Sequence, residues 1–203
     1  MSRRDVVIVD YGVGNFSSVM NSIRRIGHRC RASRDRKVIS ESDVIILPGV
    51  GAFPTAMEHL AASGLGDLII ERAGEGHPVI GLCLGMQLMM EESVEHRRTA
   101  GLGMIPGRVV PFDQAPWHIG WNTIENVSGD AMLDASDGEA VYFNHSYMIE
   151  TPAEYHLCTS RLTAPFASGI RRGNVVGLQF HPEKSQAAGR EILASLIAGL
   201  CDA

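Results

Sequence analysis

Gly81-Leu82-Cys83-Leu84-Gly85 joins an apolar run, Pro78-Val79-Ile80, to a stretch of helical character at residues 86–91. A strand that turns sharply into a helix, with a cysteine flanked by glycines, is typical of the thiol form of a nucleophile elbow. Glycine suits such a turn because it lacks a Cβ and can adopt positive φ or pack closely. Cys83 would then lie at a helix N-terminus, where free N–H groups favour a thiolate and can stabilise an oxyanion. The alternative is a buried structural cysteine in an ordinary strand–helix turn.

A histidine and a glutamate that could complete a catalytic set lie far along the chain, in Gln179-Phe180-His181-Pro182-Glu183. This motif ends a second apolar run, residues 174–178. A thiol nucleophile needs a base to take or hold its proton, and the base needs an orienting group. Alternation in an extended segment would put the His181 and Glu183 side chains on the same side. We therefore predict a catalytic triad of Cys83, His181 and Glu183.

The order of the apolar runs predicts an α/β fold. Strands are expected at residues 5–10 and 42–47, and helices at 17–26 and 54–73, the second interrupted near Gly64. This alternation of strand and helix favours parallel pairing with helices on both faces. Short extended runs between residues 103 and 170 suggest antiparallel additions, and a last helix is expected at 187–200. We predict an open, mostly parallel, twisted sheet with helices on both faces and an antiparallel extension.

Composition limits the function without specifying it. A chain of 203 residues, 45% of them hydrophobic, suits one globular domain over residues 1–203. The net charge of −5 argues against nucleic-acid binding. The first residues do not have the pattern of a signal peptide, and no apolar run reaches the roughly 18 residues of a membrane span, so we expect neither. Its four cysteines are scattered without metal-ligand spacing, so we expect a reduced cytoplasmic protein without structural zinc.

The turn after the first strand, Tyr11-Gly12-Val13-Gly14-Asn15, carries a Gly-x-Gly pattern that hints at dinucleotide binding. A fingerprint of that kind needs a third glycine and an acidic residue after the next strand. Ser17 occupies the glycine position, and the charges at residues 34–37 are mixed in sign. We therefore expect no nucleotide cofactor, and no cofactor or metal of any other kind.

Taken together, the Gly-x-Cys-x-Gly and His-Pro-Glu motifs resemble those of class I, triad-type glutamine amidotransferases. These thiol hydrolases have a flavodoxin-like fold and release ammonia from glutamine for a partner synthase. Further segments resemble, in particular, the glutaminase subunits of imidazole glycerol phosphate synthases. They are Pro48-Gly49-Val50-Gly51, Cys83-Leu84-Gly85-Met86-Gln87-Leu88, His118-Ile119-Gly120-Trp121-Asn122, His145-Ser146-Tyr147 and Gln179-Phe180-His181-Pro182-Glu183-Lys184-Ser185. The resemblance covers nearly the whole chain.

The resemblance implies a partner and a pathway. The partner is a (β/α)₈ barrel cyclase subunit, which forms a heterodimer with the glutaminase and receives its ammonia directly. Together they make imidazole glycerol phosphate and aminoimidazole carboxamide ribotide in histidine biosynthesis. The small-molecule substrate of this subunit is then glutamine.

The resemblance also assigns roles outside the triad. An oxyanion hole is implied at Val50 or Gly51, with Leu84 as the second N–H donor. The implied contacts with the substrate glutamine are Gly49, Gln87, Glu95, His145 and Ser146. The implied contacts with the partner subunit are Asn15, Trp121, Asn122 and Lys184. The local sequence alone is also compatible with purely structural roles. Residues 48–51 could be a turn that ends a strand, and Gln87 could be a solvent-exposed residue of a helix. Trp121 could simply pack at the edge of the hydrophobic core.

Two positions depart from the family pattern. Trp117 stands where proline is usual, and Asn144 stands where a small apolar residue is common. They leave the triad intact but keep other functions open. One alternative is a paralogous glutaminase that feeds a related synthase in surface-sugar biosynthesis. A stand-alone thiol hydrolase of the same fold and a non-catalytic binding module are the others.

Overall fold

After Asp5, the first strand is apolar at every residue because both of its faces are covered. The computed structural model describes residues 2–12, 14 and 16–202, and in it β1 (Asp5–Val9) pairs in parallel on both sides. Val6 and Ile8 face one hydrophobic core, and Val7 and Val9 face a second. A parallel strand buried in this way reads as a continuous hydrophobic run.

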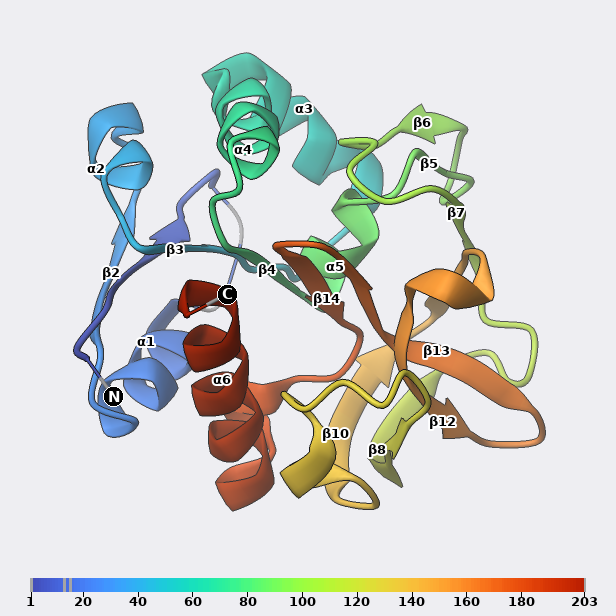
Figure 1. The fold of residues 1–203 in the computed structure, drawn as a ribbon. Coiled ribbons are helices and arrows are strands. Elements are labelled where there is room, and N and C mark those ends of the chain that lie inside the picture. Colours follow the sequence, from blue (N-terminus) through green and yellow to red (C-terminus); the bar gives the residue numbers. More distant parts are fainter. Residues whose placement is uncertain (1, 13, 15, 203) are drawn as a thin grey trace.

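β1 belongs to an eight-stranded sheet that crosses the molecule (Figure 1). The strand order is β2-β1-β3-β4-β14-β13-β12-β9. The members besides β1 are β2 (Arg29–Ser33), β3 (Val44–Leu47), β4 (Val79–Leu82), β14 (Val175–Leu178), β13 (Pro165–Arg172), β12 (His156–Arg161) and β9 (Glu125–Asn126). The first five strands in that order are parallel, and the last three run antiparallel. The predicted fold class, a mostly parallel sheet with an antiparallel extension, is confirmed.

Helices cover both faces of the sheet (Figure 1). One core contains side chains of α1 (Phe16–Arg25) and α6 (Gln186–Cys201). The other contains side chains of α2 (Arg36–Ser40), α3 (Phe53–Ser63) and α4 (Leu65–Gly74). The predicted break near Gly64 is confirmed, since that residue ends α3 at φ 64° and α4 begins directly after it. None of the helices in the described part of the chain could cross a membrane.

The middle of the chain forms two smaller sheets. One pairs β8 (His118–Thr123) with β10 (Ala140–His145). The other has the order β11-β7-β5-β6, built from β11 (Tyr147–Glu150), β7 (Arg108–Pro111), β5 (Glu92–Ser93) and β6 (Thr99–Ala100). Three short 3-10 helices lie at η1 (Asp134–Ser136), η2 (Ala153–Tyr155) and η3 (Pro182–Lys184). Most of these pairings are antiparallel as expected, but β5 and β7 run parallel.

The central pair of parallel strands sets the position of the candidate site. β4 and β14 are neighbours, and their last residues, Leu82 and Leu178, are register partners. The residues that follow, Cys83 and Gln179-Phe180-His181, therefore leave the sheet side by side. Ligands of open α/β sheets bind at this carboxyl edge of the strands.

Candidate active site

Cys83 occupies a strained turn between β4 and α5 (Leu84–Leu88). Its backbone lies at φ 52° and ψ −108°, and its N–H donates to the Leu178 carbonyl at 2.7 Å. Positive φ is rare for a residue with a side chain and is tolerated where neighbouring structure enforces it. We expected the flanking glycines either to adopt positive φ or to allow close packing. Neither Gly81 nor Gly85 has positive φ, so the first reason is wrong. Close packing accounts for them instead, since a Cβ on Gly85 would lie 1.9 Å from the Leu47 carbonyl oxygen.

His181 lies between Cys83 and Glu183. Its Nδ1 is 2.8 Å from Glu183 Oε1, and its other side is within hydrogen-bonding reach of the Cys83 thiol. Both side chains of the His–Glu pair are almost fully buried. The reason for the pairing differs from the one predicted, because the segment is not extended through Glu183. Pro182 starts η3, and this turn brings the Glu183 carboxylate back to the imidazole.

The charge state of His181 follows from these neighbours. Burial alone would lower the pKa of His181, but Cys83, as its thiolate, and the Glu183 carboxylate together raise it to about 9. An opposite charge at hydrogen-bond distance favours the charged form of a titrating group. At neutral pH His181 is therefore an imidazolium that faces Cys83 and can give up a proton.

The loop after β3 lies against the elbow. A Cβ on Gly49 would come within 2.4 Å of Leu84 Cβ, so only glycine permits this approach. The sequence did not predict a role for Tyr11. Its hydroxyl donates a hydrogen bond to the Pro48 carbonyl at 2.6 Å and so fixes the start of this loop. Burial raises the pKa of Tyr11, so the hydroxyl keeps the proton that this bond needs. Val50 is half-exposed at the cavity and Gly51 has φ 110°, a conformation that glycine adopts without strain.

A cavity of about 310 Å³ opens above the thiol. Among the predicted residues, those that line it are Gly49, Val50, Gly51, Cys83, Leu84, Gln87, Glu95, His145, Ser146, His181 and Lys184. Asn144, one of the two departures from the family pattern, and Tyr147 complete the lining. The structure thus brings together the predicted nucleophile, the base, the oxyanion loop and the predicted substrate contacts. Within the described residues, no group of three or more His, Cys, Asp or Glu is placed to hold a metal ion.

Two predicted substrate contacts are held by the protein itself. Glu95 Oε2 accepts a hydrogen bond from Phe53 N at the start of α3, at 2.8 Å. The Gln87 amide nitrogen donates to the Tyr147 carbonyl at 3.2 Å and to Gln179 Oε1 at 3.0 Å. Because both N–H groups of the Gln87 amide are engaged, its Oε1 is the atom left to meet a ligand.

His145 is also bonded inside the protein at both ring nitrogens. Nδ1 lies 2.8 Å from the Tyr147 carbonyl, and Nε2 lies 3.1 Å from Nδ1 of His118. A carbonyl can only accept, so His145 donates from Nδ1 and accepts at Nε2 from His118. Burial lowers the pKa of His145 to about 4, which keeps the ring neutral. The ring therefore orients the Tyr147 carbonyl, and His118 is a supporting residue that its sequence motif did not reveal.

Of the predicted partner contacts, Lys184 lines the cavity, whereas Trp121 and Asn122 lie on β8. Trp121 is 50% exposed and packs edge-on against Tyr142, and Lys184 Nζ lies 5.8 Å from the centre of the same ring. Asn122 is half-buried and donates to the Arg161 carbonyl at 2.9 Å. Asn15 lies outside the described residues.

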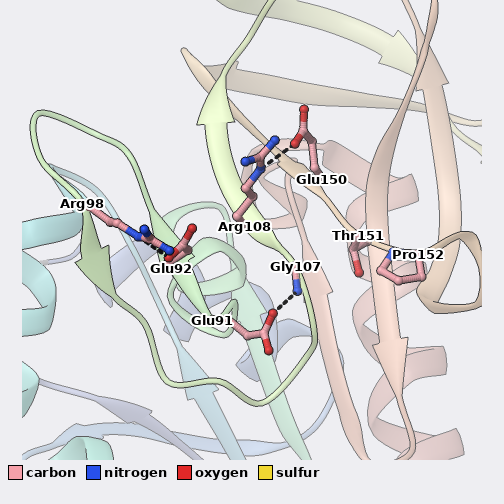
Figure 2. Close-up of a pocket in the computed structure, with 8 residues that line it drawn as sticks. All are labelled: Glu91, Glu92, Arg98, Gly107, Arg108, Glu150, Thr151 and Pro152. Carbon is pink, nitrogen blue, oxygen red and sulfur yellow. Dashed lines mark hydrogen bonds and ion pairs between the residues drawn. The ribbon is translucent and has the colours of Figure 1, made fainter.

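A larger depression of about 660 Å³ lies beside β7 and the residues that follow β11 (Figure 2). Its charged side chains neutralise one another: Arg98 pairs with Glu92 and Arg108 pairs with Glu150, each at 2.7 Å. Glu91 accepts from a backbone N–H at 2.9 Å. This depression contains neither cysteine nor histidine among its described lining residues. The smaller cavity, which holds both, is therefore the candidate active site.

Comparisons with known proteins show the family of the chain. A family model described as "Glutamine amidotransferase class-I" matches residues 7–198. The chain is 43% identical over 192 residues to "Imidazole glycerol phosphate synthase subunit HisH" of Listeria monocytogenes serotype 4a (strain HCC23), which covers 93% of this chain and 92% of the relative. It is 42% identical over 193 residues to the protein of the same name from Streptococcus sanguinis (strain SK36), with 93% of each chain covered.

Solved structures share the fold at low sequence identity. A chain of PurLQS from Thermotoga maritima superposes with a TM-score of 0.79 at 15% identity, covering 98% of this chain and 100% of that one. A glutamine amidotransferase from the same organism gives a TM-score of 0.73 at 16% identity, with 100% of both chains covered.

Proposed function

We propose, from the premise that this chain belongs to the class I glutamine amidotransferase family, that it is the glutaminase subunit of an imidazole glycerol phosphate synthase. Family membership makes the chain a glutamine-hydrolysing enzyme. The relatives at 42–43% identity carry the name of that subunit, which supports a role in histidine biosynthesis. One observation carries the proposal: Cys83 lies on a strained elbow beside His181, which is paired on its other side with Glu183.

The proposed chemistry is thiol acyl transfer. Cys83 attacks the side-chain carbonyl of glutamine, and the oxyanion accepts from the N–H of Leu84 and from the N–H of Val50 or Gly51. His181, protonated at neutral pH, gives its proton to the departing ammonia and leaves a γ-glutamyl thioester on Cys83. A water molecule activated by the now neutral His181 then hydrolyses the thioester and releases glutamate.

The remaining contacts orient the substrate. Glu95 is placed to receive the α-ammonium group of glutamine, since it is a buried carboxylate at the cavity. Gln87 would meet the substrate through Oε1, the amide oxygen that its internal bonds leave available. Gly49, Ser146 and the backbone held by His145 form the walls. The cavity volume of about 310 Å³ suits a single amino acid.

The proposed partner is a cyclase subunit that receives the ammonia directly. Ammonia released into water at neutral pH is mostly protonated and has lost its nucleophilic lone pair, so direct transfer favours the second reaction. The exposed side chains of Trp117, Ile119 and Trp121, which we call the β8 apolar face, would dock on this partner. Asn144 supports this placement because it pairs with Ile119 and also lines the cavity. Lys184 and Asn122 would flank the contact.

Glutamate release from glutamine tests the proposal. We expect little hydrolysis by the chain alone and strong stimulation by a cyclase subunit with its phosphoribulosyl nucleotide ligand. Cys83→Ala should abolish hydrolysis in the complex. Full activity without any partner would indicate a stand-alone thiol hydrolase. Stimulation only by a synthase from surface-sugar biosynthesis would indicate the paralogous glutaminase, with Trp117 and Asn144 as the first residues to compare.

A further inference from the structure

Gln179 is a buried amide whose orientation is fixed by its neighbours. It follows β14, is fully buried, and its backbone N–H bonds to the Ser168 carbonyl at 2.9 Å. The Tyr147 carbonyl can only accept, so the nitrogen of the Gln87 amide must face it. The same Gln87 nitrogen donates to Gln179 Oε1. The Gln179 nitrogen is thereby turned to the Cys83 sulfur, 3.6 Å away.

We propose that Gln179 stabilises and positions the Cys83 thiolate by donating a hydrogen bond to its sulfur. A donor favours the charged form of the group that accepts from it. Gln179 is absent from the cavity lining, so this contact acts on the nucleophile and leaves the substrate untouched. The inference rests on the proposed function in one respect, the identity of Cys83 as the nucleophile.

A second contact of the sulfur works in the opposite direction. Cys83 Sγ lies 3.8 Å from the Asn144 carbonyl oxygen, to which only a protonated thiol can donate. The thiolate would be repelled by that oxygen. The Gln179 amide therefore supports the thiolate and the Asn144 carbonyl supports the protonated thiol, so loss of the amide removes one support of the thiolate while His181 stays in place.

Other titratable groups lie around Cys83, on the elements packed against it or one side chain further away. They are His181, Glu183 and Lys184 after β14, His145 at the end of β10, Glu95 after β5 and Tyr11 after β1. None of them is hydrogen-bonded to the Gln179 amide in the described part of the chain. A change confined to this amide therefore tests its own contribution while these groups stay in place.

The pH dependence of Cys83 alkylation by iodoacetamide measures the inference directly. The rate is followed in the wild type and in Gln179→Met, with Cys83→Ala as the background for the other cysteines. Gln179→Met has a side chain of similar length, removes the donor to the sulfur and adds no charge beside it. We expect the midpoint of the alkylation profile to rise by about one pH unit, as for loss of one hydrogen bond to a charged group.

Two further variants keep the result interpretable. Ser168→Ala alters a fully buried neighbour of Gln179 that makes no contact with Cys83. The midpoint of its alkylation profile should stay within about 0.2 pH units of the wild type, well below the shift expected for the loss of one hydrogen bond. Gln87→Leu removes the group that orients Gln179, so its midpoint should rise in the same direction. If Gln179→Met does not fold, the alkylation profile of Gln87→Leu decides. In steady state, Gln179→Met should lower kcat for glutamine with KM changed less than about twofold, as expected when transition-state interactions alone are lost.

An unchanged midpoint in the Gln179 variant, or an equal shift in Ser168→Ala, would overturn the inference. Failure of the proposed function would be seen separately. Alkylation reports on Cys83 whether or not glutamine is a substrate, whereas hydrolysis that survives Cys83→Ala would remove Cys83 from the reaction.

Discussion

The backbone strain at Cys83 predicts a conflict between stability and activity. Cys83→Gly should unfold at a temperature about 2–4 °C higher than Cys83→Ala, because glycine adopts φ 52° and ψ −108° without the roughly 1 kcal/mol that a Cβ costs there. Both variants should lack glutaminase activity. Thermal unfolding of the two proteins side by side isolates the strain, since neither keeps the thiol. Equal unfolding temperatures would mean that the turn relaxes around alanine.

The Glu183–His181 pair predicts the alkaline limit of activity. The pKa of His181 is raised to about 9, so the proton for departing ammonia is present below that pH and lost above it. In Glu183→Gln the charge that favours the imidazolium is lost. The pH above which kcat/KM falls, the alkaline limb of the pH profile, should therefore move down by about one unit. We also expect kcat/KM to fall roughly 10²–10⁴-fold. The pH profile of kcat/KM checks both, and a limb that stays near pH 9 would exclude His181 as its source.

Sequence reasoning about individual side chains went furthest where a motif names the chemistry. Cys83, His181 and Glu183 were predicted from residue type and local context, and the structure places Cys83 and His181 in one cavity with Glu183 2.8 Å from the imidazole. Tyr11, His118 and Gln179 were missed because their roles depend on contacts between segments far apart in the chain. The one available signal was Gln179 itself, an amide directly after an apolar strand, where a polar group requires a buried partner.

The junction of β4 and α5 depends on backbone packing that only glycine allows. In Gly85→Ala the new Cβ would overlap the Leu47 carbonyl oxygen of the neighbouring strand, so we expect a loss of at least about 3 kcal/mol or failure to fold. Gly74→Ala is the matched control, because a Cβ there meets nothing within 4 Å at the end of α4. That variant should be neutral or more stable by up to about 1 kcal/mol. Urea unfolding measures both, and similar stabilities would contradict the packing argument.

The β8–β10 pair predicts the effect of a docking variant. If the β8 apolar face meets the cyclase subunit, Trp121→Ala should raise the Kd of the complex roughly 30-fold, as for a central aromatic anchor. Ile70→Ala, at an exposed apolar residue of α4, should leave the Kd within about twofold, since isolated surface residues contribute little. Isothermal titration calorimetry with the partner gives both values. Equal effects of the two variants would remove the β8 apolar face from the interface.

Helices and strands were predictable where their surroundings are uniform. The apolar runs that became β1, β3, β4 and β14 are covered on both faces, so every residue of these strands after Asp5 is buried. β2 was not assigned, because Arg29-Cys30-Arg31-Ala32-Ser33 at the sheet edge contains two exposed arginines and one buried side chain. The parallel pairing of β5 with β7 also escaped prediction, since two-residue strands carry no periodicity.

The position of each strand in the whole sheet predicts how slowly its amides exchange. β4 and β14 are paired on both sides and buried at every residue, whereas β6 lies at the end of the smaller sheet with partly exposed residues. We expect amide hydrogens of β4 and β14 to exchange only on global unfolding, and those of β6 to exchange by local opening. Hydrogen exchange followed by mass spectrometry checks this order. Exchange of β4 as fast as that of β6 would show that the two sheets open together.

The place of β14 in the sheet has a consequence for synthesis on the ribosome. Along the chain it is the last strand, yet in space it is inserted between β4 and β13 and joins the parallel strands to the antiparallel ones. His181 and Glu183 follow it directly. During translation, Cys83 is therefore synthesised long before β14 and before His181, the proposed base for its thiol. If the proposed triad is correct, translation products that stop short of β14 would be unable to release ammonia, so these unfinished copies could not waste glutamine.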